Sequence, residues 1–240
     1  MKTIQKNDHL QTPLRRYCLC LALAIGMAIA SPPVILAEQQ APPAKELLRY
    51  RQQTGKAAHI YSWKLEQQGE NVLITLEEPD ATFTNLCAPD GATLAWAMVS
   101  PPNTNVRAER RKDTLHVQGT FKGEAVAKEL QIGKRVWFQS LSFALSRMVA
   151  MDRAQRKFWF LRSDELELLG MRAELAGSEQ IVADGKPVAA ERVRIKLDKL
   201  VAAFWEASYW FRKSDQVFLR YRGVNGPPGT DETVIDLQPE

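Results

Sequence analysis

Apolar and polar residues alternate along most of the chain from residue 56 onward. A period of two places successive side chains on opposite faces of a β-strand. In residues 57–66, for example, Tyr61, Trp63 and Leu65 share one face, and Lys64 lies on the other. Together with residues 205–211, considered below, the pattern predicts about ten strands. The other candidate strands are 72–76, 94–99, 106–111, 115–121, 126–132, 193–197, 217–221 and 233–237.

Two segments depart from simple alternation. Between residues 136 and 151, apolar residues recur in steps of three and four, which predicts an amphipathic helix. Residues 200–211 fit either a helix or a strand, but their aromatic density and the short return to residue 217 favour a hairpin strand. The turn at Asp184-Gly185 favours a second tight hairpin.

These elements predict a mainly β fold, because many short strands and a single helix must hide one apolar sheet face. We expect a large curved antiparallel sheet, a half-barrel of about ten strands, with the mid-chain helix on its concave face. A sandwich of two sheets is the alternative arrangement.

The N-terminal residues have the pattern of a secretory leader. A basic, polar segment ends at Arg16, and residues 17–30 form an uncharged apolar run followed by two prolines. This run is short for a membrane span and typical of a signal peptide. We predict a signal peptide over residues 1–37 with cleavage after Ala37, or alternatively after Ala30. An uncleaved anchor is the competing interpretation.

The rest of the chain is predicted to be periplasmic and not lipid-anchored. Cys18 and Cys20 lack the small residues that precede a lipid-attachment cysteine, so the leader has no lipobox. Residues 38–55, rich in Gln, Ala, Pro and charge, predict a flexible polar tether, and residues 56–240 a single β half-barrel domain. Cys87 is the only cysteine beyond the leader, so no intramolecular disulfide can form.

Charge gives little indication of a nucleic-acid partner. The 240-residue chain has a formal net charge of +4, but the leader holds four of the basic residues and one acidic residue, which leaves +1. A nearly neutral domain is not a general polyanion-binding surface. The basic residues between 107 and 112 are interpreted as a solvated hairpin tip. The competing interpretation is transient contact with anionic lipid headgroups at a membrane surface.

No catalytic, metal-binding or cofactor-binding motif is found in the sequence. His59 and His116 are the only histidines beyond the leader, and neither has a cysteine or histidine at zinc-ligand spacing. The chain also lacks a Gly-x-Ser-x-Gly elbow and a glycine-rich phosphate loop. Neighbouring carboxylates on a strand point to opposite faces, so most cannot act on one substrate. We therefore expect a non-enzyme without cofactor or metal; an envelope hydrolase is the minor alternative.

Aromatic residues are the unusual feature of the chain. All six tryptophans lie beyond the leader, several of them beside other aromatic residues in predicted strands. These side chains either fill the core or line a concave cavity for an acyl chain or another apolar ligand. For the second interpretation, the candidate ligand face consists of Trp63, Trp96, Trp159, Trp205 and Tyr209.

The aromatic and turn segments also carry a resemblance. Residues 204–212 (FWEASYWFR), 218–223 (FLRYRG), 226–230 (GPPGT) and 234–237 (VIDL) resemble uncharacterised exported proteins of Gram-negative bacteria. Residues 136–140 and 157–160 extend the likeness, which covers about residues 61–237. Those proteins are in turn similar to the periplasmic lipoprotein-carrier (LolA-like) half-barrel superfamily. The resemblance implies an incomplete antiparallel barrel with a helix on its concave face and an apolar ligand, and it transfers no binding residue.

The sequence thus supports two hypotheses of different kinds. The first is a non-enzymatic periplasmic protein that binds lipid, another apolar ligand or a lipidated partner protein in an aromatic-lined concave sheet. The alternative is an envelope scaffold whose aromatic residues fill the core and whose protein partner docks on a sheet edge.

Overall fold

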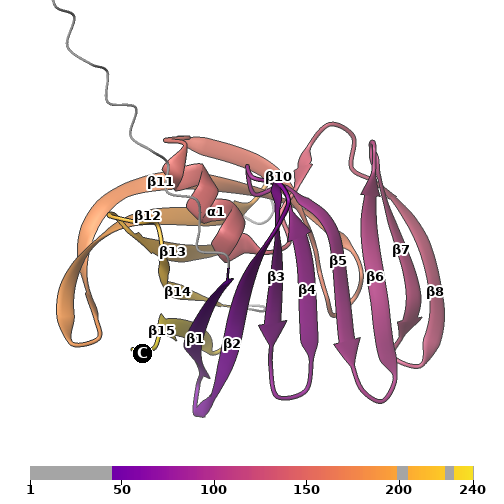
Figure 1. The fold of residues 1–240 in the computed structure, drawn as a ribbon, viewed down its shortest axis with the longest axis horizontal. Helices are drawn as coiled ribbons and strands as arrows, with labels where there is room; N and C mark the ends of the chain where they lie inside the picture. The colour runs from indigo at the N-terminus through magenta and orange to yellow at the C-terminus, as the bar shows by residue number, and fades with distance from the viewer. Residues whose placement is uncertain (1–44, 199–204, 225–229, 240) are drawn as a thin grey trace, which may run out of the picture. The chain divides into compact units, whose positions relative to one another are not determined.

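The computed structural model describes residues 45–198, 205–224 and 230–239, which lie in one compact unit. They form a curved sheet of fifteen strands and one helix, α1 (Leu141–Ala150) (Figure 1). The first eight strands are β1 (Lys45–Thr54), β2 (Ala57–Gln68), β3 (Asn71–Glu77), β4 (Thr82–Cys87), β5 (Thr93–Ser100), β6 (Thr104–Arg111), β7 (Thr114–Phe121) and β8 (Glu124–Gln131). The others are β9 (Val136–Trp137), β10 (Gln155–Leu161), β11 (Leu168–Ala183), β12 (Lys186–Leu197), β13 (Glu206–Arg212), β14 (Phe218–Val224) and β15 (Glu232–Leu237).

The sheet is a meander with a single break. Every strand pairs with its neighbour in the sequence except β8 and β9, which lie at the two edges of the sheet. The two ends of the described chain meet inside the sheet, because β1 pairs with β15. All pairings are antiparallel apart from the short contact between β9 and β10. The predicted open antiparallel sheet is confirmed, as one sheet rather than a sandwich.

The predicted number of strands is too low. The alternation pattern finds ten of the fifteen strands and misses β1, β4, β9, β10 and β11. In β10 both faces are hydrophobic, since Phe158, Trp159 and Phe160 follow one another. In β11 a bulge between Leu175 and Ser178 shifts the alternation halfway along the strand. Alternation is therefore weak in both strands.

The predicted tether is wrong for residues 45–54, which form β1 near the middle of the sheet. This strand pairs with β2 along its whole length and with β15 along half of it. Tyr50 is only 1% exposed, and its hydroxyl donates a hydrogen bond to the carbonyl oxygen of Phe218. Gln52 and Thr54, which follow Tyr50 on the same face of the strand, are polar. The sequence therefore shows no alternation of apolar and polar residues around the buried Tyr50. Residues 1–44, including the predicted signal peptide, lie outside the described residues.

The helix is shorter than predicted and packs on the inner, concave face of the sheet. Residues 136–137 form β9 instead of its first turn. Phe143, Ala144, Leu145 and Met148 of α1 are buried against residues from both flanks of the sheet. At Gly91, an added Cβ would lie 2.7 Å from the Cα of Ala144, so only glycine allows this close approach to the helix.

Two hydrophobic cores lie on the inner face. The larger, here called the helix core, joins α1 to residues of β1–β4 and β9–β14, including Tyr50, Trp63 and Phe218. The smaller, here called the break core, joins residues of β5–β7 to Ile132, Trp137, Leu161 and Leu166. The break between β8 and β9 is therefore filled by packed side chains rather than by backbone pairing.

Candidate functional site

A pocket of about 280 Å³ lies on the inner face, between the two cores. Residues of both cores line it: Trp63 and Phe218 come from the helix core, and Phe83 and Trp96 from the break core. Seventeen of the described residues line this space, which is here called the aromatic pocket, and eight of them are aromatic. The eight are Tyr50, Tyr61, Trp63, Phe83, Trp96, Phe160, Tyr209 and Phe218.

The strand register places these side chains in rows across the inner face. Trp63 of β2 lies opposite Leu76 of β3, which lies opposite Phe83 of β4. In the next row, Asn85 of β4 lies between Ile74 and Trp96. Because alternate residues of a strand share a face, both rows point into the same interior.

Tyrosine and phenylalanine rings form the opposite part of the wall. The rings of Tyr50 and Tyr61 stack with centroids 5.6 Å apart, and Phe218 lies 5.1 Å from Tyr50. Tyr209 contacts both Phe218 and Tyr221, at 5.7 Å and 4.9 Å. Tyrosine is uncharged at physiological pH, and burial raises the pKa of Tyr209 further above its ordinary value.

The structure brings three of the five sequence-predicted site residues together. Trp63, Trp96 and Tyr209 line the aromatic pocket, whereas Trp159 and Trp205 do not. The Trp159 indole N–H donates to the carbonyl oxygen of Ile132 at 2.8 Å, and the Arg135 guanidinium lies over its ring. The Trp205 indole N–H donates to the carbonyl oxygen of Val224 at 2.6 Å. Both side chains thus have structural partners outside the pocket.

Sequence reasoning missed the polar residues of the pocket. Asn85 and Glu78 line it together with Gln139, Ser140, Ser142 and Ser163. Asn85 could have been recognised from the sequence pattern, because it occupies an inward position between Phe83 and Cys87, where the alternation predicts an apolar side chain. Glu78 could not have been recognised in this way, because it follows the end of β3 and the direction of its side chain depends on the turn.

Asn85 and Glu78 are held in the pocket without protein partners for their oxygen atoms. Asn85 is only 6% exposed, and its Oδ1 atom has no hydrogen-bond partner among the described residues. Within the same part of the chain, Glu78 forms no side-chain hydrogen bond or ion pair, and burial raises its pKa, although nearby His59 opposes this shift. Burial, and secondarily the charge of Glu78, also raises the pKa of Tyr61.

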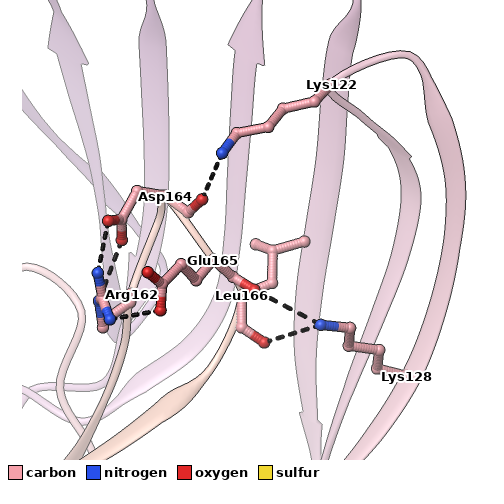
Figure 2. Close-up of polar contacts among 6 residues, drawn as sticks. All are labelled: Lys122, Lys128, Arg162, Asp164, Glu165 and Leu166. Carbon is pink, nitrogen blue, oxygen red and sulfur yellow. Dashed lines mark hydrogen bonds and ion pairs between the residues drawn. The ribbon is translucent and has the colours of Figure 1, made fainter.

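A loop across the break forms one side of the pocket. Residues 162–167, here called the strap, connect β10 to β11, and Ser163 within them lines the pocket. Figure 2 shows two lysines that reach the strap from the other edge of the sheet. Lys122 Nζ donates to the carbonyl oxygen of Asp164 at 2.7 Å, and Lys128 Nζ donates to that of Leu166 at 3.4 Å.

Arg162 stiffens the strap from within. Its guanidinium forms ion pairs with the carboxylates of Asp164 and Glu165 (Figure 2). The Arg162 backbone N–H donates to Glu167, and the Leu166 N–H donates back to Arg162, which closes a tight turn. The strap is thus an ordered wall that spans the break.

Two further features limit the chemistry of the described residues. Among them, no three His, Cys, Asp or Glu side chains are close enough to share a metal ion. In the same residues, no helix has the length and apolar character needed to cross a bilayer. Cys87 is fully buried, and burial raises the pKa of its thiol to about 12, so it is a poor nucleophile.

Comparisons with known proteins identify a fold. No protein-family model and no curated protein matches this sequence. Among solved structures, a beta-barrel-like protein of the domain of unknown function DUF1849 from Brucella abortus superposes with a TM-score of 0.56 at 9% identity. The match covers 82% of this chain and 99% of that one. The predicted resemblance to uncharacterised Gram-negative proteins is confirmed at the level of fold.

Two other structures align over similar lengths with lower scores. The hypothetical lipoprotein YmcC from Escherichia coli has a TM-score of 0.34 and 9% identity, with 82% of this chain and 85% of that chain covered. A DUF1329 family protein from Desulfovibrio piger has a TM-score of 0.27 and 13% identity, with 81% and 82% covered.

Proposed function

We propose that this protein is a non-enzymatic periplasmic protein that binds lipid, another apolar ligand or the lipid group of a partner protein in the aromatic pocket. The observation that carries the proposal is the pocket itself, a space lined by eight aromatic side chains between two cores. Interiors of folded proteins are normally packed to crystal-like density. A space of this size within an aromatic interior is typical of a binding site for an apolar molecule.

The size of the pocket limits the ligand. A volume of about 280 Å³ is at the lower end of ligand sites, which span roughly 300–1,000 Å³. The pocket therefore accommodates a small apolar molecule or one end of a single chain. A lipid with two long chains would have to leave most of its mass outside.

The polar groups of the pocket support binding rather than hydrolysis. Ser140, Ser142 and Ser163 line the pocket, and no histidine is among the described lining residues. A nucleophilic serine needs a base within hydrogen-bond reach. Glu78 is the only carboxylic acid among the described lining residues, and no hydrogen bond within them joins it to a serine. The periplasmic location is proposed from the leader alone.

The exposed edge of β8 favours the second candidate function, a scaffold that docks a protein partner. Among the described strands, β8 pairs only with β7, and its other side has no partner strand. None of its side chains is buried. An open edge can accept a strand from another protein.

Native mass spectrometry before and after organic extraction tests the first candidate. The full chain is expressed with its leader and purified without detergent. We expect a bound mass that extraction removes, and less of it in Ser163→Phe, which fills the pocket. Ser214→Phe makes the same change on an exposed turn, and should leave the bound mass as in the unmodified protein.

A different result would move the search to protein partners. A clean unliganded mass, with no binding of a hydrophobic fluorescent probe, contradicts the lipid-binding proposal. A specific protein that co-purifies through the β8 edge would then support the scaffold. Leader cleavage is checked on the same spectra by the mass of the mature chain.

A further inference from the structure

The lining of the aromatic pocket is apolar at most positions but acidic at one. Glu78 is the only charged residue among the seventeen described residues that line the pocket. Within the described residues it forms no ion pair; nearby His59, which is not among the residues that line the pocket, lowers its pKa but does not outweigh the effect of burial. A carboxylate in an otherwise uncharged wall repels anionic ligand groups and attracts cationic ones.

Asn85 adds an unused hydrogen-bond acceptor to the same wall. The side chain is more than nine-tenths buried, and its Oδ1 atom is without a partner among the described residues. A buried acceptor of this kind is rare in folded proteins, because its loss of water is not compensated. A ligand that carries an N–H or O–H group would compensate it.

The aromatic rings around these two residues favour the same chemistry. Trp96 lies beside Asn85 in the sheet register, and Tyr61 is close enough for the charge of Glu78 to act on it. The electron-rich faces of Trp and Tyr attract ammonium groups. Three kinds of group in one pocket, a carboxylate, an amide oxygen and aromatic faces, therefore complement a cationic donor.

From this arrangement we infer that the aromatic pocket selects amphiphiles whose polar end is an ammonium or another hydrogen-bond donor, and discriminates against carboxylates. The inference rests on the proposed function, since it assigns the headgroup chemistry of the ligand whose apolar part the aromatic wall holds. The ammonium lies against Glu78 and Asn85, and the alkyl chain lies along the rings.

Three probes with the same tail and different heads test this selection. Octylamine, octanol and octanoate share an alkyl chain short enough for the pocket, and their affinities for the full-length mature protein are measured by calorimetry. We expect octylamine to bind about tenfold or more tighter than octanoate, with octanol between them.

Two adjacent glutamates supply the matched variants. Glu78→Gln should remove the preference for octylamine over octanol while octanol still binds. Glu77→Gln makes the same change on the outer face, where Glu77 pairs with Lys64, and should leave the order of affinities unchanged. Asn85→Leu should weaken octanol and octylamine together.

The outcomes separate this inference from the proposed function. If octanoate binds as tightly as octylamine, or if Glu78→Gln leaves the preference intact, the headgroup assignment is wrong and the apolar pocket stands. If none of the three probes binds, the proposed function itself fails, and the headgroup assignment fails with it.

Discussion

Two adjacent residues show how the outer face of the sheet differs from the aromatic pocket. Glu77 lies on the outer face, where its carboxylate is 2.6 Å from Lys64 Nζ and also accepts a hydrogen bond from Ser62. These partners lower the pKa of Glu77. Glu78 lies in the pocket, where burial raises its pKa. One step along the chain reverses the electrostatic environment.

The same contrast extends over both regions. On the outer face, charged residues of neighbouring strands pair directly, as in Lys196 with Glu206 and Arg222 with Glu232. In the pocket, the oxygen atoms of Asn85 and Glu78 have no such partners among the described residues. Many charged groups of the outer face pair with one another, whereas the pocket leaves the acceptors of Asn85 and Glu78 for a molecule from outside.

The largest expected effect concerns stability. Phe143→Ala removes a buried ring that anchors α1 in the helix core, and should lower the free energy of unfolding by about 3–5 kcal/mol. Lys196→Ala removes an ion pair from the outer face and should cost about 1 kcal/mol or less. Urea denaturation measures both. Equal losses in the two variants would mean that an ion pair on the outer face stabilises the fold as much as a buried ring in the core, which would contradict the contrast between the two regions.

A moderate effect of opposite sign is expected at Asn85. Asn85→Leu replaces a buried, unpaired acceptor with an apolar side chain of similar size, in a row that contains Ile74 and Trp96. We expect the free energy of unfolding to rise by about 1–2 kcal/mol, because the cost of the lone acceptor disappears. A drop in the urea midpoint would show instead that the amide has a partner in solution.

The two glutamates should differ in sign when pH is varied. A raised pKa means that the charged form of Glu78 destabilises the native state above its folded pKa, so Glu78→Gln should gain stability at pH 7 and lose that gain on acidification. A lowered pKa means that Glu77 stabilises the fold above its unfolded pKa. Glu77→Gln should therefore lose stability at pH 7, and this loss should vanish as pH falls through the folded pKa. Thermal unfolding followed from pH 7 down to pH 3 measures both; effects of the same sign at pH 7 would contradict the contrast between the pocket and the outer face.

The same comparison explains how much of the fold could be predicted. Alternation identifies strands that have one wet and one dry face, such as β2, β3, β6 and β7. It fails where a strand departs from that rule. In β1, polar Gln52 follows buried Tyr50 on the same face, and in β10, Trp159 places a large ring on the face opposite Phe158. Such strands are recognisable only once their neighbours are known.

The candidate site was predictable to a smaller extent. Trp96 and Trp159 look alike in the sequence, as tryptophans within apolar segments. Their difference comes from pairing: Trp96 lies beside Asn85 in the pocket wall, whereas Trp159 lies next to the break and hydrogen-bonds Ile132. The break depends on which strands fail to pair, and local alternation carries no information about that.

The smallest expected effect is at the strap, which joins the two edges of the sheet beside the pocket. Lys128→Met keeps the apolar stem of the side chain but removes the donor to the carbonyl oxygens of Glu165 and Leu166. Because these bonds are long and partly exposed, the free energy of unfolding should change by less than about 1 kcal/mol. Backbone amides of residues 163–167 should nevertheless exchange faster with deuterated water, since the strap would lose an anchor across the break. Lys112→Met makes the same change at the β6–β7 hairpin tip and should leave that exchange unaltered. Unchanged exchange in Lys128→Met would show that Lys128 does not anchor the strap, and that Lys122 and the buried Leu166 side chain hold it across the break.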